Sequence, residues 1–199
     1  MQYYERSNTS ISRSETKRDK ILRGAAQLFT EKSYLGTSVD ELASKLKLNK
    51  ASIYYYFKDK EHLLYEVGCR AIEDLIKKAN AIATTDASPM EKMESLVKLH
   101  LETGADLSNF WGVPHRELRQ LSSKLFKSYV VYRDKYEQIF RDLMREGIAN
   151  GQIKDCEPCL KVRFILGLVN SVSIWYKRTG PLTIGQIGDE MWKFISHSL

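Results

Sequence analysis

Proline, glycine and cysteine are all scarce in this chain. Its 199 residues include four prolines and 11 glycines, too few for the many tight turns that a β-sandwich or β-barrel needs. Three cysteines are too few to form a disulfide framework in a chain of this length. We therefore expect an all-α protein with long uninterrupted helices and no structural disulfides.

Long apolar runs are absent as well. No stretch approaches the ~20 apolar residues that a membrane-spanning helix requires. The first 20 residues are polar and charged, and they lack the apolar segment that a signal peptide carries. The sequence therefore predicts a cytoplasmic protein with no membrane partner.

Reactive side chains are few and scattered. Cys156 and Cys159 have C-x-x-C spacing, but a structural zinc site requires four ligands, usually with a second such pair. Asp106, His115 and the cysteine pair show no nucleophile–base motif. We expect no metal site, no other cofactor and no enzymatic activity, and a redox role for the cysteine pair stays open.

The positive charge is concentrated in the first third of the chain. Of the net charge of +6, residues 1–60 contribute +5, from 12 Lys and Arg against seven Asp and Glu. A basic head on a near-neutral body is typical of proteins that bind polyanions such as DNA. Charge alone leaves open the alternative of a basic surface that faces only solvent.

Three short helices are expected in the basic head, because apolar residues recur at helical spacing over residues 21–29, 39–46 and 53–57. Side chains that can accept a hydrogen bond from the first turn precede these helices and the next one. The expected N-caps are Ser14 or Thr16, Thr37 and Ser38, Asn49, and Asp59. The second and third helices, joined by a short turn, form a helix-turn-helix, whose second helix can lie in the major groove of DNA.

Three consecutive tyrosines lie in that second helix, at positions 54 to 56. If Ile53 and Phe57 point into the core, Tyr55 lies about 200° around the helix from Ile53, on the outer face. Tyr54 and Tyr56 then flank the buried side and direct their hydroxyl groups outward. An exposed tyrosine there can bond phosphate oxygens and pack against a sugar or a thymine methyl group.

Residues 16–65 closely resemble the N-terminal DNA-binding motif of the TetR family of one-component bacterial transcription regulators. Three segments carry the resemblance most clearly: residues 25–29, residues 37–39 and residues 53–60. The resemblance implies a helix-turn-helix domain over residues 14–60 and an effector-binding and dimerisation domain over residues 61–199. It also implies a homodimer that represses transcription by binding double-stranded operator DNA.

Two positions depart from the family pattern. Ser33 and Lys47 stand where members usually have glycine, and a left-handed conformation at a residue other than glycine costs about 1 kcal/mol. Lys47 also adds a positive charge close to the expected DNA.

The resemblance assigns DNA contacts residue by residue, with hydroxyl groups at a helix N-terminus for phosphates and the second helix of the motif for bases. The implied DNA-binding residues are Thr37, Ser38, Lys47, Lys50, Ala51, Ser52, Tyr54, Tyr55, Tyr56 and Lys60. Residues 1–13 are expected to form a disordered N-terminal arm. The alternative is that Arg6, Arg13, Lys17 and Arg18 follow the DNA backbone.

The rest of the chain shows helical patterns only. The expected helices run over residues 60–79, 90–107, 115–126, 128–146, 158–176 and 183–197. The resemblance implies that the last two form the dimer interface. Their apolar stripes are Val162, Ile165, Val169, Val172 and Tyr176, and Ile184, Ile187, Met191, Phe194 and Ile195. Such stripes are also typical of an ordinary intramolecular core.

Large apolar rings and arginines in this body predict a pocket for a hydrophobic effector. The segment Asn170-x4-Trp175-Tyr176-x3-Gly180 resembles a pattern of acyl-CoA-responsive, FadR-like regulators. The expected ligand-binding residues are Phe110, Trp111, Arg116, Leu118, Arg119, Tyr132, Arg133, Tyr136, Phe164, Leu168, Asn170 and Trp175. The alternatives are a regulator of the multidrug type with another apolar or aromatic ligand, an accessory protein with a vestigial head, and an enzyme.

Overall fold

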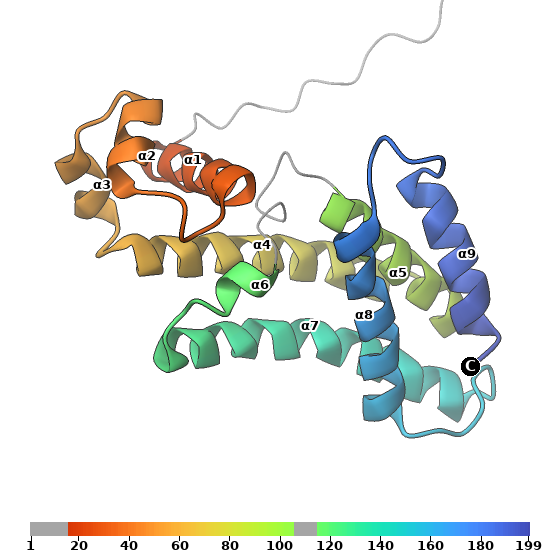
Figure 1. Cartoon of the computed structure of the whole chain (residues 1–199). Coiled ribbons are helices and arrows are strands. Elements are labelled where there is room, and N and C mark those ends of the chain that lie inside the picture. Colours follow the sequence, from red (N-terminus) through yellow and green to blue (C-terminus); the bar gives the residue numbers. More distant parts are fainter. Residues whose placement is uncertain (1–15, 106–114) are drawn as a thin grey trace, which may run out of the picture.

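The structure is a computed structural model that describes residues 16–105 and 115–199, and all regular secondary structure in those two stretches is helical. The helices are α1 (Lys17–Lys32), α2 (Val39–Leu46), α3 (Lys50–Tyr56), α4 (Lys60–Ala83), α5 (Pro89–Ala105), α6 (His115–Leu118), α7 (Ser123–Ala149), α8 (Pro158–Trp175) and α9 (Ile184–Ser196). The first three gather at one end of α4, and the others form a larger body along the rest of it (Figure 1). The all-α prediction is therefore confirmed.

The helices of the head begin where the polar caps predict. The side chains of Thr16, Ser38, Asn49 and Asp59 each accept a hydrogen bond from a backbone N–H in the first turn of the helix that follows. Each bond satisfies a donor that has no partner inside the helix. Four local sequence signals thus define how the chain enters α1, α2, α3 and α4.

A small apolar core holds the head together. Phe29 of α1, Leu42 of α2, and Ile53 and Phe57 at α3 are all buried. α1 also packs on α4, where Arg18 forms an ion pair with Glu66 at 2.6 Å. Arg18 is therefore part of the head itself, whereas Arg6 and Arg13 lie outside the described residues.

The predicted break between two body helices was placed too late in the chain. We expected helices over residues 115–126 and 128–146, but α6 ends at Leu118 and α7 begins at Ser123. Two interactions stabilise the turn between them: the Leu121 side chain is buried, and the Leu121 N–H donates to the carbonyl of Leu118. The Ser122 N–H donates to the carboxylate of Glu61 on α4.

The end of α7 lies at Ala149, three residues beyond residue 146, where the sequence predicted that Gly147 together with Gly151 would end the helix. A Cβ at Gly147 would lie 2.5 Å from Cδ1 of Ile153, so this glycine makes room for a packed side chain inside the helix. The chain turns instead around Gly151, which has a φ of 71°. Two glycines close together therefore have different roles, close packing at one and backbone conformation at the other.

Ser33 and Lys47 both adopt positive φ angles, 67° and 55°. Lys47 is left-handed and ends α2: its N–H donates to Ser44 O, and the Leu48 N–H donates to Ala43 O. These two bonds are the Schellman arrangement, in which glycine is the usual residue. The turn of the helix-turn-helix is thus built with the usual geometry in spite of the lysine.

We expect the substitution Lys47→Gly to stabilise the protein. The substitution removes the strain of a left-handed lysine, roughly 1–2 kcal/mol. Glycine also makes the unfolded chain more flexible, which lowers stability by roughly 0.5–1 kcal/mol, so the free energy of unfolding should rise by about 0.5–1 kcal/mol. Thermal unfolding followed by circular dichroism would show a midpoint raised by about 2 °C. Lys47→Ala is the matched control, since it removes the same charge without relieving φ, and an equal rise in both variants would contradict this explanation.

Candidate functional site

The three tyrosines of α3 are all exposed on the surface of the head. Tyr55 is 82% exposed, while Tyr54 and Tyr56 are 44% and 36% exposed. The neighbouring Ile53 and Phe57 are buried, so the helix has the orientation that the spacing predicts. The Tyr56 ring contacts the Tyr55 ring edge-on, with centroids 5.0 Å apart. A rigid aromatic surface therefore faces outward on the helix expected to read DNA.

Most of the other predicted DNA contacts lie at the surface near these tyrosines. Lys47, Lys50, Ala51 and Ser38 are exposed, and Ser52 is half-buried. The Lys50 ammonium group donates to Asp40 Oδ2 at 2.8 Å, across from α3 to α2. That ion pair is exposed, so it stabilises little and can exchange for a phosphate at low cost.

Thr37 differs from the rest of the predicted set. Its side chain is buried, and its hydroxyl donates to the backbone oxygens of Ser33 at 2.9 Å and Leu28 at 3.3 Å. The side chain thus joins the end of α1 to the start of α2. Its hydroxyl lies inside the head rather than on its surface, so a structural role explains its contacts.

Lys60 is the first residue of α4 and is half-buried. Its ammonium group lies 4.2 Å from the centroid of the Tyr34 ring, and burial lowers its pKa. A cation–π contact of this kind holds the ammonium group in place and, unlike an ion pair with a carboxylate, does not neutralise its charge. The helix N-terminus adds a favourable field for an anion such as a phosphate.

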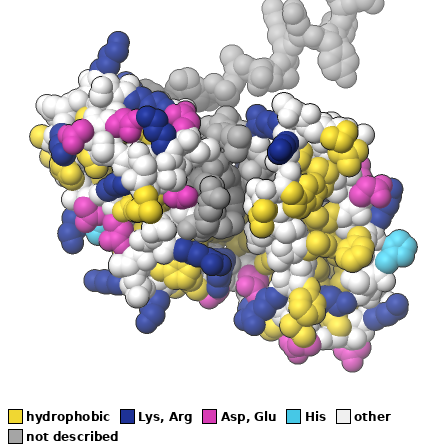
Figure 2. Space-filling model, in the orientation of Figure 1, with side chains coloured by type: hydrophobic (Ala, Val, Ile, Leu, Met, Phe, Trp, Pro, Cys, Tyr) yellow, Lys and Arg dark blue, Asp and Glu magenta, His cyan; other side chains and the backbone are white. Residues whose placement is uncertain are grey.

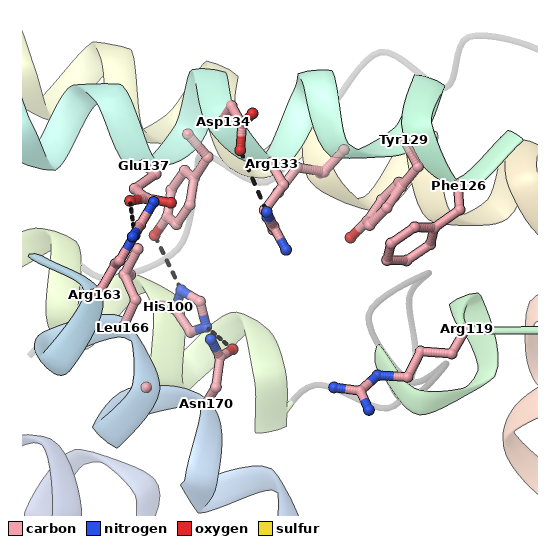
Figure 3. Close-up of a pocket in the computed structure, with 13 residues that line it drawn as sticks. His100, Arg119, Phe126, Tyr129, Arg133, Asp134, Glu137, Arg163, Leu166 and Asn170 are labelled. Atoms are coloured by element: carbon pink, nitrogen blue, oxygen red, sulfur yellow. Dashed lines mark hydrogen bonds and ion pairs between the residues drawn. The ribbon is translucent and has the colours of Figure 1, made fainter. Parts of the chain in front are cut away.

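A cavity of about 520 Å³ lies in the body, between α4, α5, α7 and α8 (Figure 3). Its lining mixes aromatic rings with charged and amide side chains. The lining residues are Ile72, His100, Arg119, Phe126, Tyr129, Arg133, Asp134, Tyr136, Glu137, Arg163, Leu166, Gly167 and Asn170. The volume is within the usual range for a small-molecule site, about 300–1,000 Å³.

One end of the cavity carries a hydrogen-bonded chain centred on His100. Its Nδ1 lies 3.2 Å from the Tyr136 hydroxyl, and its Nε2 lies 3.1 Å from Asn170 Oδ1. An amide oxygen only accepts, so with this amide orientation Nε2 carries the proton and donates to it. Burial raises the pKa of the Tyr136 hydroxyl, which therefore stays protonated. The chain leaves the Asn170 amide nitrogen as a hydrogen-bond donor beside the cavity.

Three arginines surround the cavity, and they differ in their partners. Arg163 lies 3.6 Å from the buried carboxylate of Glu137, which also pairs with Arg141. Arg133 makes only a long contact of 3.5 Å with Asp134. Within residues 16–105 and 115–199, no ion pair is found for Arg119, and its side chain points into the cavity (Figure 3). Arg119 and Arg133 are thus the cations best placed to receive an anionic group.

The predicted ligand residues divide into several groups. Arg119, Arg133, Tyr136 and Asn170 line the cavity. The other predicted residues with described side chains are outside the lining: Leu118 is buried against Gly68, Tyr132 and Leu168 are half-buried, and Phe164 and Trp175 are exposed. Phe110 and Trp111 lie outside the described residues, as does the side chain of Arg116.

His100, Glu137 and Arg163 line the cavity although sequence reasoning did not select them. His100 stands alone among apolar residues of α5, where a histidine is usually part of the core. Glu137 could have been suspected as an acidic residue on the apolar side of α7, four positions before Arg141.

Comparison with known proteins places the chain in a family. Residues 21–67 match the family model described as "Bacterial regulatory proteins, tetR family". A second model, "Tetracyclin repressor-like, C-terminal domain", matches residues 86–199, which is more than half of the chain. The chain belongs to the TetR family.

Similar TetR-family proteins cover nearly the whole chain. The HTH-type transcriptional repressor KstR2 of Mycolicibacterium smegmatis is 28% identical over 190 residues, 90% of this chain and 88% of that protein. The crystal structure of PfmR from Thermus thermophilus has a TM-score of 0.82 at 28% identity, over 91% of this chain and 99% of that one. AibR, solved with isovaleryl coenzyme A and operator DNA, has a TM-score of 0.80 at 23% identity, over 90% and 97%.

In this TetR-family chain, α8 has three distinct faces. Val162, Ile165, Val169 and Val172 are buried inside the chain, so the predicted stripe on this helix forms intramolecular core. A second face lines the cavity. The third is apolar and exposed, and with parts of α9 it forms the hydrophobic surface seen in Figure 2. Its large members are Leu160, Phe164, Ile174 and Trp175, with Phe194 on α9.

The exposed face also explains the unusual composition of α8. By length and composition alone this 18-residue helix could cross a membrane. The sequence had predicted no segment of that kind. One of its faces packs within the chain and a second lines the cavity, so the third, apolar face is left exposed on a helix that the TetR resemblance assigns to the dimer interface. Large exposed apolar patches mark interaction surfaces. We therefore call Leu160, Phe164, Ile174, Trp175 and Phe194 the dimer face.

We expect Phe164→Glu to convert the dimer into a monomer, because the substitution buries an unpaired charge twice across a two-fold axis. Sedimentation-velocity ultracentrifugation would show the smaller species at micromolar concentration. Val131→Glu, on an exposed apolar residue of α7, is the matched control and should remain dimeric. A dimeric Phe164→Glu variant would contradict the assignment of the dimer face.

Proposed function

We propose that the protein is a cytoplasmic, homodimeric transcriptional repressor that binds operator DNA and is released from it by an acyl-CoA thioester. The observation that carries the DNA-binding half is the exposed Tyr55 on α3, in a head that holds most of the net positive charge. The cavity beside Arg119 and Arg133 supports the ligand-binding half. This is a binding protein and not an enzyme.

The proposed DNA binding is supported by two groups of side chains in the head, one for base edges and one for phosphates. Tyr55, Ala51 and Lys50 are on the outward side of α3, where side chains reach base edges when the helix lies in the major groove. Lys60 and the hydroxyl groups of Tyr54 and Tyr56 are placed for phosphates. Two such heads related by a dimer axis match half-sites about 34–36 Å apart.

The ligand-binding half rests on the chemistry of the cavity. Arginine suits the phosphates of coenzyme A because its planar guanidinium group binds phosphate oxygens in pairs. Phe126 and Tyr129 supply apolar rings for an acyl chain or a ring system. The fold itself accommodates both partners, since AibR has been solved with isovaleryl coenzyme A and operator DNA.

The His100 end of the cavity narrows the ligand class further. A plain alkyl chain placed there would leave the Asn170 amide N–H groups without an acceptor, which is costly when such a chain excludes water from them. An acyl group that carries a keto or hydroxyl oxygen would provide that acceptor. The cavity therefore favours an oxygenated acyl thioester over an unsubstituted one.

We expect Tyr55→Ala and Lys60→Ala to weaken operator binding in different ways. Loss of a base contact costs about 1–3 kcal/mol, so Tyr55→Ala should lower affinity about tenfold or more for the operator but little for unrelated DNA. Lys60→Ala should weaken binding to all sequences and reduce the salt slope by about 1. Fluorescence anisotropy on DNA from upstream of the gene would measure both, with Val131→Ala as control. Unchanged affinity in both variants would refute the DNA surface.

A panel of acyl-CoA thioesters tests the ligand. With the salt concentration fixed, a cognate thioester should release the DNA while free coenzyme A does not, and Arg119→Ala should raise the required concentration about tenfold. Butyryl-CoA compared with 3-hydroxybutyryl-CoA tests the preference for an acyl oxygen. If DNA binds but no thioester acts, the DNA-binding half stands and another apolar or aromatic ligand becomes the better hypothesis.

A further inference from the structure

Three consecutive residues at the end of α6 contact three different parts of the molecule. Glu117 reaches the DNA-binding head, Leu118 packs into α4, and Arg119 lines the cavity. Neighbouring residues in one short turn cannot move far independently. This segment therefore joins the cavity to the head by covalent bonds rather than through a long series of contacts.

The contact of Glu117 with the head is direct and shielded from water. Its side chain is 7% exposed, and its Oε2 accepts a hydrogen bond from the backbone N–H of Tyr34 at 2.7 Å. Tyr34 follows α1, 83 residues earlier in the chain. A hydrogen bond to a carboxylate is stronger than a neutral one, and breaking it here would leave a buried acceptor without this donor.

Tyr34 in turn contacts elements that hold and place the head. Its ring packs edge-on against Phe29 of α1, with centroids 5.6 Å apart. The same ring is also contacted by the ammonium group of Lys60, which lies 4.2 Å from the ring centroid. A displacement of the Tyr34 backbone therefore reaches both the core of the head and the lysine assigned to a DNA phosphate.

The middle residue, Leu118, keeps the segment close to α4. A Cβ at Gly68 would lie 2.6 Å from Cδ2 of Leu118, so the two elements approach at a point where α4 has no side chain. Four residues further on, the Ser122 N–H donates to Glu61 in the first turn of α4. The segment thus contacts α4 through Leu118 and Ser122 and contacts the head through Glu117.

On these contacts, and assuming the repressor function proposed above, we propose that Glu117 is the positioning residue that couples the cavity to the DNA-binding head. An anionic ligand group in the cavity binds the Arg119 guanidinium and pulls it towards the ligand. The turn follows, and the bond from Glu117 to the Tyr34 N–H lengthens or breaks. The head then loses one of the contacts that fix its angle on α4, and the two heads of the dimer no longer match successive major grooves.

The first test needs no ligand. Glu117→Ala should weaken operator binding about tenfold, the scale of one lost charge-assisted hydrogen bond, and should speed hydrogen exchange at the Tyr34 amide. Glu117→Gln keeps an acceptor and should restore part of both. Glu146→Ala removes an exposed carboxylate near the end of α7 and is the matched control. Circular dichroism checks that each variant is folded, and wild-type operator affinity in a folded Glu117→Ala variant would overturn the proposal.

The second test measures coupling. The ratio of operator Kd values with and without saturating thioester should fall about fivefold or more in Glu117→Ala, within the usual range of coupling between sites. Isothermal titration calorimetry on DNA-free protein should show that the thioester still binds. Failure of the wild-type protein to bind DNA or to release it would count against the proposed function. Wild-type release with an unchanged ratio in the variant would count against Glu117 alone.

Discussion

The single unbroken helix α4 is the constraint on which the rest of the structure depends. At 24 residues it extends about 36 Å, and it belongs to both halves of the chain. Its first turns hold α1 and the head, and its later turns pack against α7 and α5. Leu64, Val67 and Leu75 are completely buried along it. Ile72 of the same helix lines the cavity, so one rigid element lies against both the cavity and the head.

Burial of charge organises the cavity around that helix. Glu137 is buried, and its carboxylate pairs with the guanidinium groups of Arg141 and Arg163. This ion-pair cluster occupies one end of the cavity. Separating a buried ion pair costs more free energy than a weakly bound ligand supplies. Arg119, at the other side, is not engaged in such a cluster within the described residues. The cavity therefore separates a fixed ion-pair cluster from Arg119, a cation that can respond to a ligand.

The head could be predicted nearly residue by residue because its signals are local. Asn49 and Asp59 cap helices through bonds that span three residues, and the spacing of Ile53 and Phe57 alone orients Tyr55. The body could not be predicted in this way. α8 is apolar on its core side and on its exposed side, so its periodicity does not show which apolar residues are buried. Phe164 and Trp175, expected at the cavity, face outward for this reason.

Departures from local folding rules concentrate at the positions to which we assign DNA binding, dimerisation and release, as is usual for functional sites. Lys47 is strained in a left-handed turn, where glycine would be relaxed, but a glycine there would remove a cation beside α3. Tyr55 and the dimer face expose large apolar groups that a protein selected only for stability would bury. Glu117 commits a buried carboxylate to a backbone amide instead of a hydrophobic contact. An alkyl side chain there would stabilise the turn by packing but would give no bond for a ligand to break. The cost in stability at these positions is therefore the physical requirement for a head that can both bind and be released.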